Sequence, residues 1–254
     1  MPRSTAPWNT IQTFLGEFVI SFLFGFVVYS AVLTVNLEQL NSGSILVGLA
    51  LGFSGIALIY SFLDITIAHF NPIITLAAIC FGKLPILRGL LFIVMQFLGF
   101  MAAAGAILGC FPGKKSDLLD IINPGPVNSN VSGINIVLTE GFLSAILVFV
   151  AFSVAINKYQ KPVYNTLEEG ELLTRPEDET PDTTILGPLC IGLTLGFLAL
   201  LGGSSSGGAF NPAVVLAPVL FTGNWSNSWE YWCGQLIGGL LGALIQFVLM
   251  TRMY

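Results

Sequence analysis

The chain has 254 residues, of which 54% are hydrophobic and only 9% are charged. Because a soluble domain carries about 25% charged residues, this composition excludes an ordinary soluble protein and indicates a chain that crosses a membrane several times. The net charge of −5 comes largely from one loop and gives no indication of a nucleic-acid partner.

Six apolar runs are each long enough, at about 20 residues, to span a hydrocarbon core. They cover residues 11–35, 43–66, 86–109, 133–156, 185–203 and 228–250. The pattern of a cleaved signal peptide does not precede the first run, so we expect this run to be retained as a helix. The sequence therefore predicts an all-α membrane protein with six transmembrane helices.

Two shorter apolar segments, 67–82 and 207–222, are too short to cross a membrane, and both contain the same sequence motif. Phe-Asn-Pro occurs at 70–72 and again at 210–212, and Leu and Ala follow each copy at the same spacing. The two asparagines are 140 residues apart (211 − 71). Asn is a favoured helix N-cap and Pro is favoured at the first helical position, so each copy predicts a helix start.

Helix starts at membrane depth require interrupted backbone, which is tolerated there only inside protein or along a wet cavity. Matching interruptions in two halves are typical of an inverted repeat. We therefore expect a single domain, 1–254, with repeats over about 11–110 and 133–250 and two re-entrant half-helices that enter from opposite sides. The alternative is that each Asn-Pro is a turn between hydrophobic segments.

The basic residues predict the orientation. If both termini are cytoplasmic, seven basic residues lie inside and two outside, which the positive-inside rule favours. The inside set is Arg3, Lys83, Arg88, Lys158, Lys161, Arg175 and Arg252, and the outside set is Lys114 and Lys115. This choice places two glycosylation sequons, at Asn130 and Asn224, on the outer side. A plasma-membrane location is favoured, with an intracellular membrane as the alternative.

The loop 157–184 is then cytoplasmic. It contains seven acidic residues and three prolines, a composition that resists packing. We expect a mobile, solvated connector, and the alternative is a gate or regulatory surface.

Two acidic residues, Glu17 and Glu140, lie at membrane depth in equivalent spans of the two halves. A carboxylate there must face the interior and find partners. The free backbone N–H groups of the interrupted segments are the natural partners, which predicts a loop-supporting role. A proton relay is the rival interpretation, but the only histidine is His69.

The sequence does not predict an enzyme, a cofactor or a metal site. The four cysteines stand singly, and no set of nucleophile, base and orienting residue is evident.

Together these residues resemble the aquaporin (major intrinsic protein) family, whose hallmark is a pair of Asn-Pro-Ala boxes on half-helices that meet at mid-membrane. The resemblance extends over nearly the whole chain, from Glu17 to about Gln246. The residues that match the boxes are Asn71, Pro72, Ile73, Asn211, Pro212 and Ala213. The family implies a homotetramer with one pore per subunit, a supporting role for Glu17, Glu140 and Gln96, and a pore-vestibule position for His69. A satisfied buried imidazole is the alternative for His69.

Two departures from the family pattern affect the expected pore. The first box ends in Ile73 instead of Ala, and we expect this bulkier side chain to pinch the passage. Most members have Arg directly after the second box, where this chain has Val214. Counting back from each Asn, the resemblance implies a selectivity filter of Leu51, Ala199, Gly208 and Val214, without a charge or a side-chain donor.

The leading functional hypothesis is a passive channel for water and small neutral solutes such as glycerol, urea or peroxide, with the Asn pair excluding protons and ions. One alternative is a poorly conducting membrane-structural or junctional protein on the same fold. A proton-coupled carrier is a third hypothesis, for which Glu17 and Glu140 are the candidate groups.

Overall fold

The computed structural model describes residues 7–156 and 183–250, and all regular structure within these ranges is helical. The elements in chain order are α1 (Pro7–Leu37), α2 (Gly43–Phe62), α3 (Pro72–Cys80), α4 (Ile86–Cys110), α5 (Lys115–Ile122), α6 (Gly133–Ala151), the π-helix η1 (Phe152–Ile156), α7 (Thr183–Gly202), α8 (Pro212–Thr222) and α9 (Ser228–Met250). The acidic loop 157–184 lies, apart from its last two residues, outside the described residues.

The long helices match the expected spans. Five of them, α1, α2, α4, α6 with η1, and α9, are long and apolar enough to cross a membrane, and α7 adds the shorter apolar stretch Leu186–Gly202. The chain leaves α2 at Phe62, four residues before the expected end of that span at 66. The short helix α5 was not expected from the sequence, and it buries Leu118, Leu119 and Ile122.

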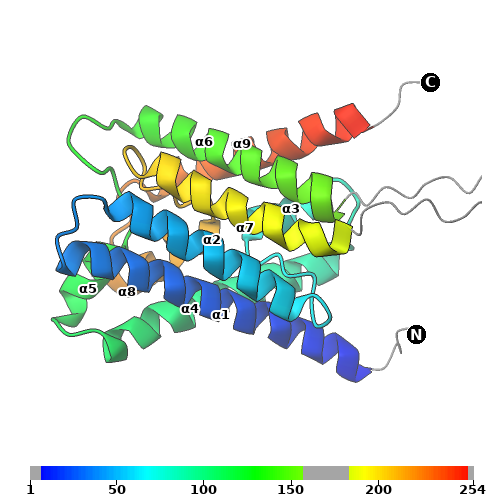
Figure 1. The fold of residues 1–254 in the computed structure, drawn as a ribbon, viewed down its shortest axis with the longest axis horizontal. Helices are drawn as coiled ribbons and strands as arrows, with labels where there is room; N and C mark the ends of the chain where they lie inside the picture. Colours follow the sequence, from blue (N-terminus) through cyan, green and yellow to red (C-terminus); the bar gives the residue numbers. More distant parts are fainter. Residues whose placement is uncertain (1–6, 157–182, 251–254) are drawn as a thin grey trace, which may run out of the picture.

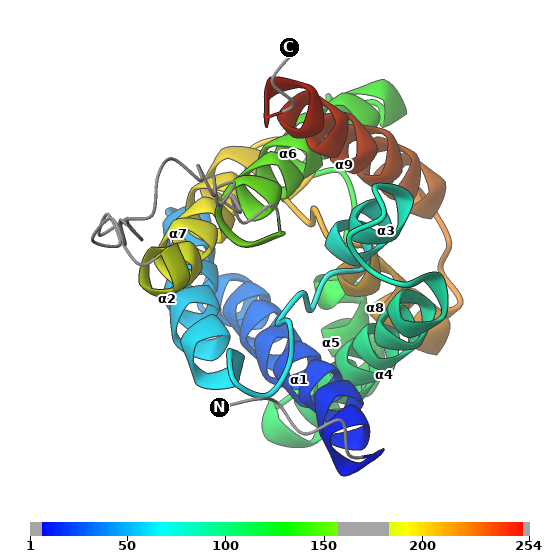
Figure 2. The same cartoon turned by 90° about the vertical axis from the view of Figure 1, so that its right-hand side faces the viewer.

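The elements α3 and α8 are half-length helices. With 9 and 11 residues they are about 14 and 17 Å long, which is half of a hydrocarbon core of about 30 Å. They lie toward opposite ends of the molecule, whereas α1 begins and α9 ends at the same end (Figure 1). Viewed along the long axis, the long helices form a ring, and the segments that lead into α3 and α8 run into its middle (Figure 2).

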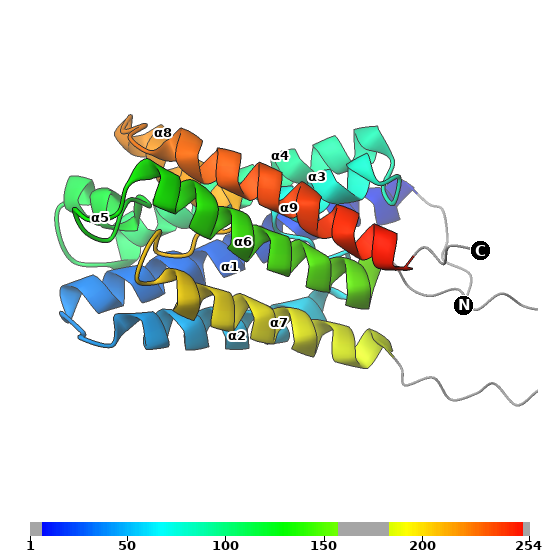
Figure 3. The same ribbon diagram turned by 90° about the horizontal axis from the view of Figure 1, so that it is seen from above.

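The long helices pack as pairs, with α1 on α4, α6 on α9 and α2 on α7. The pair α6 and α9 lies next to the pair α2 and α7 (Figure 3). Small residues allow the close approach, as membrane helices require. A methyl group on Gly196 would lie 2.9 Å from the carbonyl oxygen of Gly48. Gly234 and Gly242 of α9 similarly face carbonyl groups of α6.

Candidate functional site at the junction of the half-helices

Each half-helix begins at its box asparagine, because the side chain caps the helix that follows. Asn71 and Asn211 have extended backbone, with φ of −147° and −149°. The Oδ1 of Asn71 accepts a hydrogen bond from the backbone N–H of Ile73 at 3.1 Å, and the Oδ1 of Asn211 accepts one from Ala213 at 2.9 Å. Proline follows each cap at the first helical position, where its missing N–H leaves no bond unmade.

The two caps are tied to each other. The Nδ2 of Asn71 donates to the carbonyl of Phe210 at 3.0 Å, and the Nδ2 of Asn211 donates to the carbonyl of Phe70 at 3.0 Å. These bonds place the asparagines next to one another although they are far apart in sequence. A side-chain amide has two N–H donors, and neither amide makes a second donation within the described residues. Each therefore keeps one N–H at the point where α3 and α8 meet.

The loop before α3 is held by Glu17, which is fully buried. Its Oε1 accepts from the Thr66 hydroxyl at 2.8 Å and from the His69 N–H at 3.1 Å. Its Oε2 accepts from the Phe70 N–H at 3.1 Å and from the Gln96 side chain at 2.8 Å. All four partners donate, and a carboxylate has about four acceptor positions, so the contacts fit the ionised form.

The loop before α8 is held in the same way by Glu140, also fully buried. Its Oε1 accepts from the Ser206 hydroxyl at 2.6 Å and the Ala209 N–H at 3.0 Å. Its Oε2 accepts from the Phe210 N–H and the Gln235 side chain, both at 2.7 Å. A proton relay would need a second ionisable group beside the carboxylate, whereas the partners of both carboxylates among the described residues are hydroxyl groups, side-chain amides and backbone N–H groups. This geometry argues against the proton-coupled carrier.

The phenylalanines before the boxes have unusual backbone. Phe70 and Phe210 have φ of 33° and 31°, a left-handed region that bulky residues rarely adopt. The N–H of each is bonded to a carboxylate and the C=O of each is bonded to the opposite asparagine. These bonds on both sides of the peptide hold a conformation that would otherwise be unfavourable.

A cavity of about 350 Å³ opens at the end of the molecule where α2 ends and α7 begins. Its lining is mainly apolar, and includes Leu63, Ile67, Val154 and Ile191. His69 also lines it, at 8% exposure, while the Nδ1 of its ring lies 3.1 Å from the Thr75 hydroxyl. The cavity extends to Phe70 and therefore leads to the first box.

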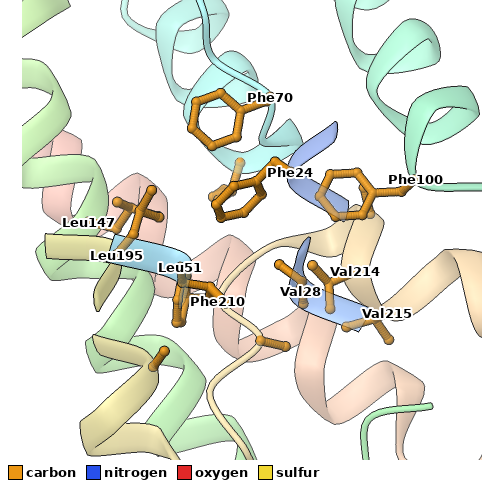
Figure 4. Close-up of a cluster of buried hydrophobic side chains, with 14 of the residues drawn as sticks. Phe24, Val28, Leu51, Phe70, Phe100, Leu147, Leu195, Phe210, Val214 and Val215 are labelled. Atoms are coloured by element: carbon orange, nitrogen blue, oxygen red, sulfur yellow. The ribbon is translucent and has the colours of Figure 1, made fainter. Parts of the chain in front are cut away.

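The four filter positions implied by the resemblance are all buried, and three of them belong to one hydrophobic core. Leu51, Ala199 and Val214 are 3%, 1% and 6% exposed. Gly208 has φ of 71° and lies against Ala199, since a methyl group on it would be 3.3 Å from the Ala199 Cα. Figure 4 shows Leu51 and Val214 in a cluster whose side chains are apolar.

Ile73, which we expect to narrow the passage, lies against α9. Its side chain is fully buried and packs against Gly239 of α9, where an added methyl group would overlap it. The extra bulk is therefore accommodated between α3 and α9.

Three supporting residues were missed in the sequence. Gln235 holds Glu140 as Gln96 holds Glu17, and the spacing was a usable signal: Gln96 follows Asn71 by 25 residues and Gln235 follows Asn211 by 24. The single hydroxyl hydrogen of Tyr231 is shared between the carbonyls of Gly125, at 3.0 Å, and of Ser206. Tyr29 donates to the carbonyl of Val214 at 3.0 Å. No local signal indicated the two tyrosine contacts.

The sequon asparagines, Asn130 and Asn224, are both exposed. They lie in loops at the end of the molecule opposite to the start of α1 (Figure 1). Among the described residues, no three His, Cys, Asp or Glu side chains are grouped so that they could hold a metal ion.

Comparison with known proteins gives concordant results. The model of the family "Major intrinsic protein" matches residues 4–246. An aquaporin of Encephalitozoon intestinalis is 48% identical over 245 residues, covering 96% of each chain. An aquaporin of Vairimorpha ceranae is 46% identical over 251 residues, covering 98% of this chain and all of the relative. Aquaporin-B of Dictyostelium discoideum is 36% identical over 96% of this chain.

Among solved structures, the aquaglyceroporin from Plasmodium falciparum superposes with a TM-score of 0.73 at 16% identity, covering 96% of both chains. At this identity the match concerns the fold. It confirms the helical membrane architecture with paired half-helices that the sequence predicts.

Proposed function

Because the chain belongs to the major intrinsic protein family, the aquaporins, and is thus a membrane channel for water or small solutes and not an enzyme, we propose that it conducts water and small neutral solutes past Asn71 and Asn211. The observation that carries this proposal is the reciprocal bonding of the two asparagines, which leaves one amide N–H of each at the junction. The roles of the individual residues below are part of the proposal.

Proton exclusion follows from the opposed helix starts. The N-termini of α3 and α8 each present about half a positive charge, and each capping asparagine keeps one free amide N–H beside them. A water molecule there accepts hydrogen bonds from both amides and directs its own hydrogens away. This orientation interrupts the chain of hydrogen bonds along which protons move, and the positive ends of the helices repel cations.

Selectivity in the outer half of the channel depends on size. Leu51, Ala199, Gly208 and Val214 provide no charge and no side-chain donor, so a solute at this filter is not selected by hydrogen bonding to side chains. On the inner side the cavity lined by His69 forms the vestibule. Glu17 and Glu140 support the two pore loops.

The cellular setting is the second part of the proposal. The family resemblance implies a homotetramer with one pore in each subunit. The distribution of basic residues favours cytoplasmic termini, and a plasma-membrane location is favoured over an intracellular one.

The conducting role is tested with purified protein in liposomes. Shrinkage in sucrose, followed by stopped-flow light scattering, should be much faster than in empty liposomes, and glycerol and urea gradients should then show re-swelling. Water permeability equal to that of empty liposomes would reject the channel and favour the membrane-structural alternative.

The outer filter is tested with Val214→Arg, with Val214→Leu as a control that adds bulk without charge. Arg adds hydrogen-bond donors and a positive charge to a narrow site. We expect glycerol flux to fall roughly tenfold more than water flux, and Leu to reduce both fluxes similarly. Equal losses of water and glycerol flux with Arg would place the filter elsewhere.

A further inference from the structure

The pseudo-symmetric halves differ in the size of the residue that follows each Asn-Pro. Ile73 occupies this position in α3 and Ala213 occupies it in α8, and both are fully buried. Both also donate their backbone N–H to the asparagine that caps the helix. A shift of either residue therefore moves the amide that the junction depends on.

The size difference is reversed in the long helices on which the half-helices pack. Gln96 of α4 and Gln235 of α9 hold equivalent carboxylates, so the two helices can be aligned on them. Four residues further on, α4 has Phe100 and α9 has Gly239. The half-helix α3 packs on α9, so the large Ile73 meets the helix that has glycine at this position. The half-helix α8, which contains the small Ala213, packs on α4, the helix that has phenylalanine at this position.

The contact at Gly239 leaves no spare room. A methyl group there would overlap the Cγ1 of Ile73, lie 2.7 Å from its Cδ1 and lie 3.3 Å from the Cγ2 of Val148. This face of α9 is separate from the face formed by Gly234 and Gly242, whose nearest neighbours are carbonyl groups of α6. In the other half, Phe100 is fully buried and points into the cluster that contains Val214 (Figure 4).

We propose that Ile73 and Gly239 are a size-matched pair that sets the depth of α3 against α9 and so positions the Asn71 amide at the junction. Ile73 acts as a positioning residue through its backbone N–H. The pairing itself is independent of conduction, whereas its effect on permeation rests on the proposed function.

A double-mutant cycle tests the pairing. Gly239→Ala should lower the midpoint of thermal unfolding in detergent by roughly 5 °C or more, because overpacking a filled site is destabilising. In the Ile73→Ala background the same change should cause no loss, since the space is then free. Gly242→Ala is the matched control, because its methyl group meets Ala145 of α6 and should destabilise both backgrounds equally.

Equal losses from Gly239→Ala in the two backgrounds would overturn the pairing. If Gly239→Ala alone gives no folded protein, the yield of monodisperse protein replaces the melting point as the readout. Recovery of that yield in the double mutant is then expected. Its failure, when Ile73→Ala alone folds, would count against the pair.

Water permeability per folded channel tests the positioning role. Ile73→Val keeps the branched contact with Gly239 and should retain permeability, whereas Ile73→Ala frees α3 and should reduce permeability several-fold. Unchanged permeability per channel in Ile73→Ala would overturn positioning. If the unmodified protein does not conduct, the channel proposal fails, and the unfolding cycle still decides the pairing.

Discussion

At the scale of single residues, the two buried carboxylates explain how interrupted backbone persists at membrane depth. Burying an isolated charge is strongly unfavourable, and four donors around each carboxylate offset this penalty. Two of the four donors in each case are backbone N–H groups of the pore loops. Each carboxylate therefore accepts hydrogen bonds from backbone N–H groups that have no partner in a helix, and these N–H groups in turn stabilise the buried charge.

Replacing Glu17 with Gln tests this interdependence. One side-chain oxygen would become an NH₂ group facing donors, so at least one buried donor would lose its acceptor, at about 1–3 kcal/mol each. We expect the unfolding midpoint to fall by roughly 5–10 °C, measured by differential scanning fluorimetry in detergent. Glu140→Gln should have a similar effect.

Glu38 provides the control, because it is exposed at the end of α1 and its change to Gln should leave the midpoint within about 1 °C. An unchanged midpoint in Glu17→Gln would mean that the loop before α3 is held by other contacts.

At the scale of elements, local chemistry made some features predictable. The capping preferences of Asn and Pro mark the starts of α3 and α8 without tertiary information, and apolar run length marks the long helices. The end of α2 was misplaced because Leu63 and Ile65 continue the apolar run although the chain has already turned toward the first box. The helix α5 was missed because eight residues carry too little periodicity.

Contacts between halves were not predictable from local patterns. The bonds between Asn71 and the Phe210 carbonyl, and between Asn211 and the Phe70 carbonyl, join residues 139 and 141 positions apart. The fit of Ile73 against Gly239 depends on how α3 lies on α9. Sequence alone therefore did not show this packed interface.

Tyr231 joins three elements at the end of the molecule opposite to the start of α1. From α9, its one hydroxyl hydrogen is shared between a carbonyl of the α5–α6 loop and a carbonyl of the loop before α8. Tyr231→Phe should leave these carbonyls without their donor and destabilise the protein by about 1–3 kcal/mol, seen as a lower unfolding midpoint. Trp229→Phe is the control on the same helix, since Trp229 is 62% exposed. A midpoint as high as that of the control would show that the link contributes nothing to stability.

At the scale of the whole molecule, the helix ends divide the surface into two faces. The start of α1, the end of α9 and the ends that flank residues 157–182 lie on one face, where the cavity lined by His69 also opens (Figure 1). The loops with Asn130 and Asn224 lie on the other face. An experiment that shows which side of the membrane one of these features faces therefore also shows which side the others face.

Glycosylation in microsomal membranes provides this assignment. With cytoplasmic termini, Asn130 should be modified, because it is exposed in a loop on the opposite face, and Asn130→Gln should abolish the shift in electrophoretic mobility. We expect Asn224 to be a poorer acceptor, since its Oδ1 already accepts from the Ser226 N–H at 3.1 Å and its carbonyl from Asn123 at 3.3 Å. A sequon placed before residue 7 should stay unmodified. Modification at that sequon and not at Asn130 would show that the orientation is the reverse, with the His69 cavity on the outer side.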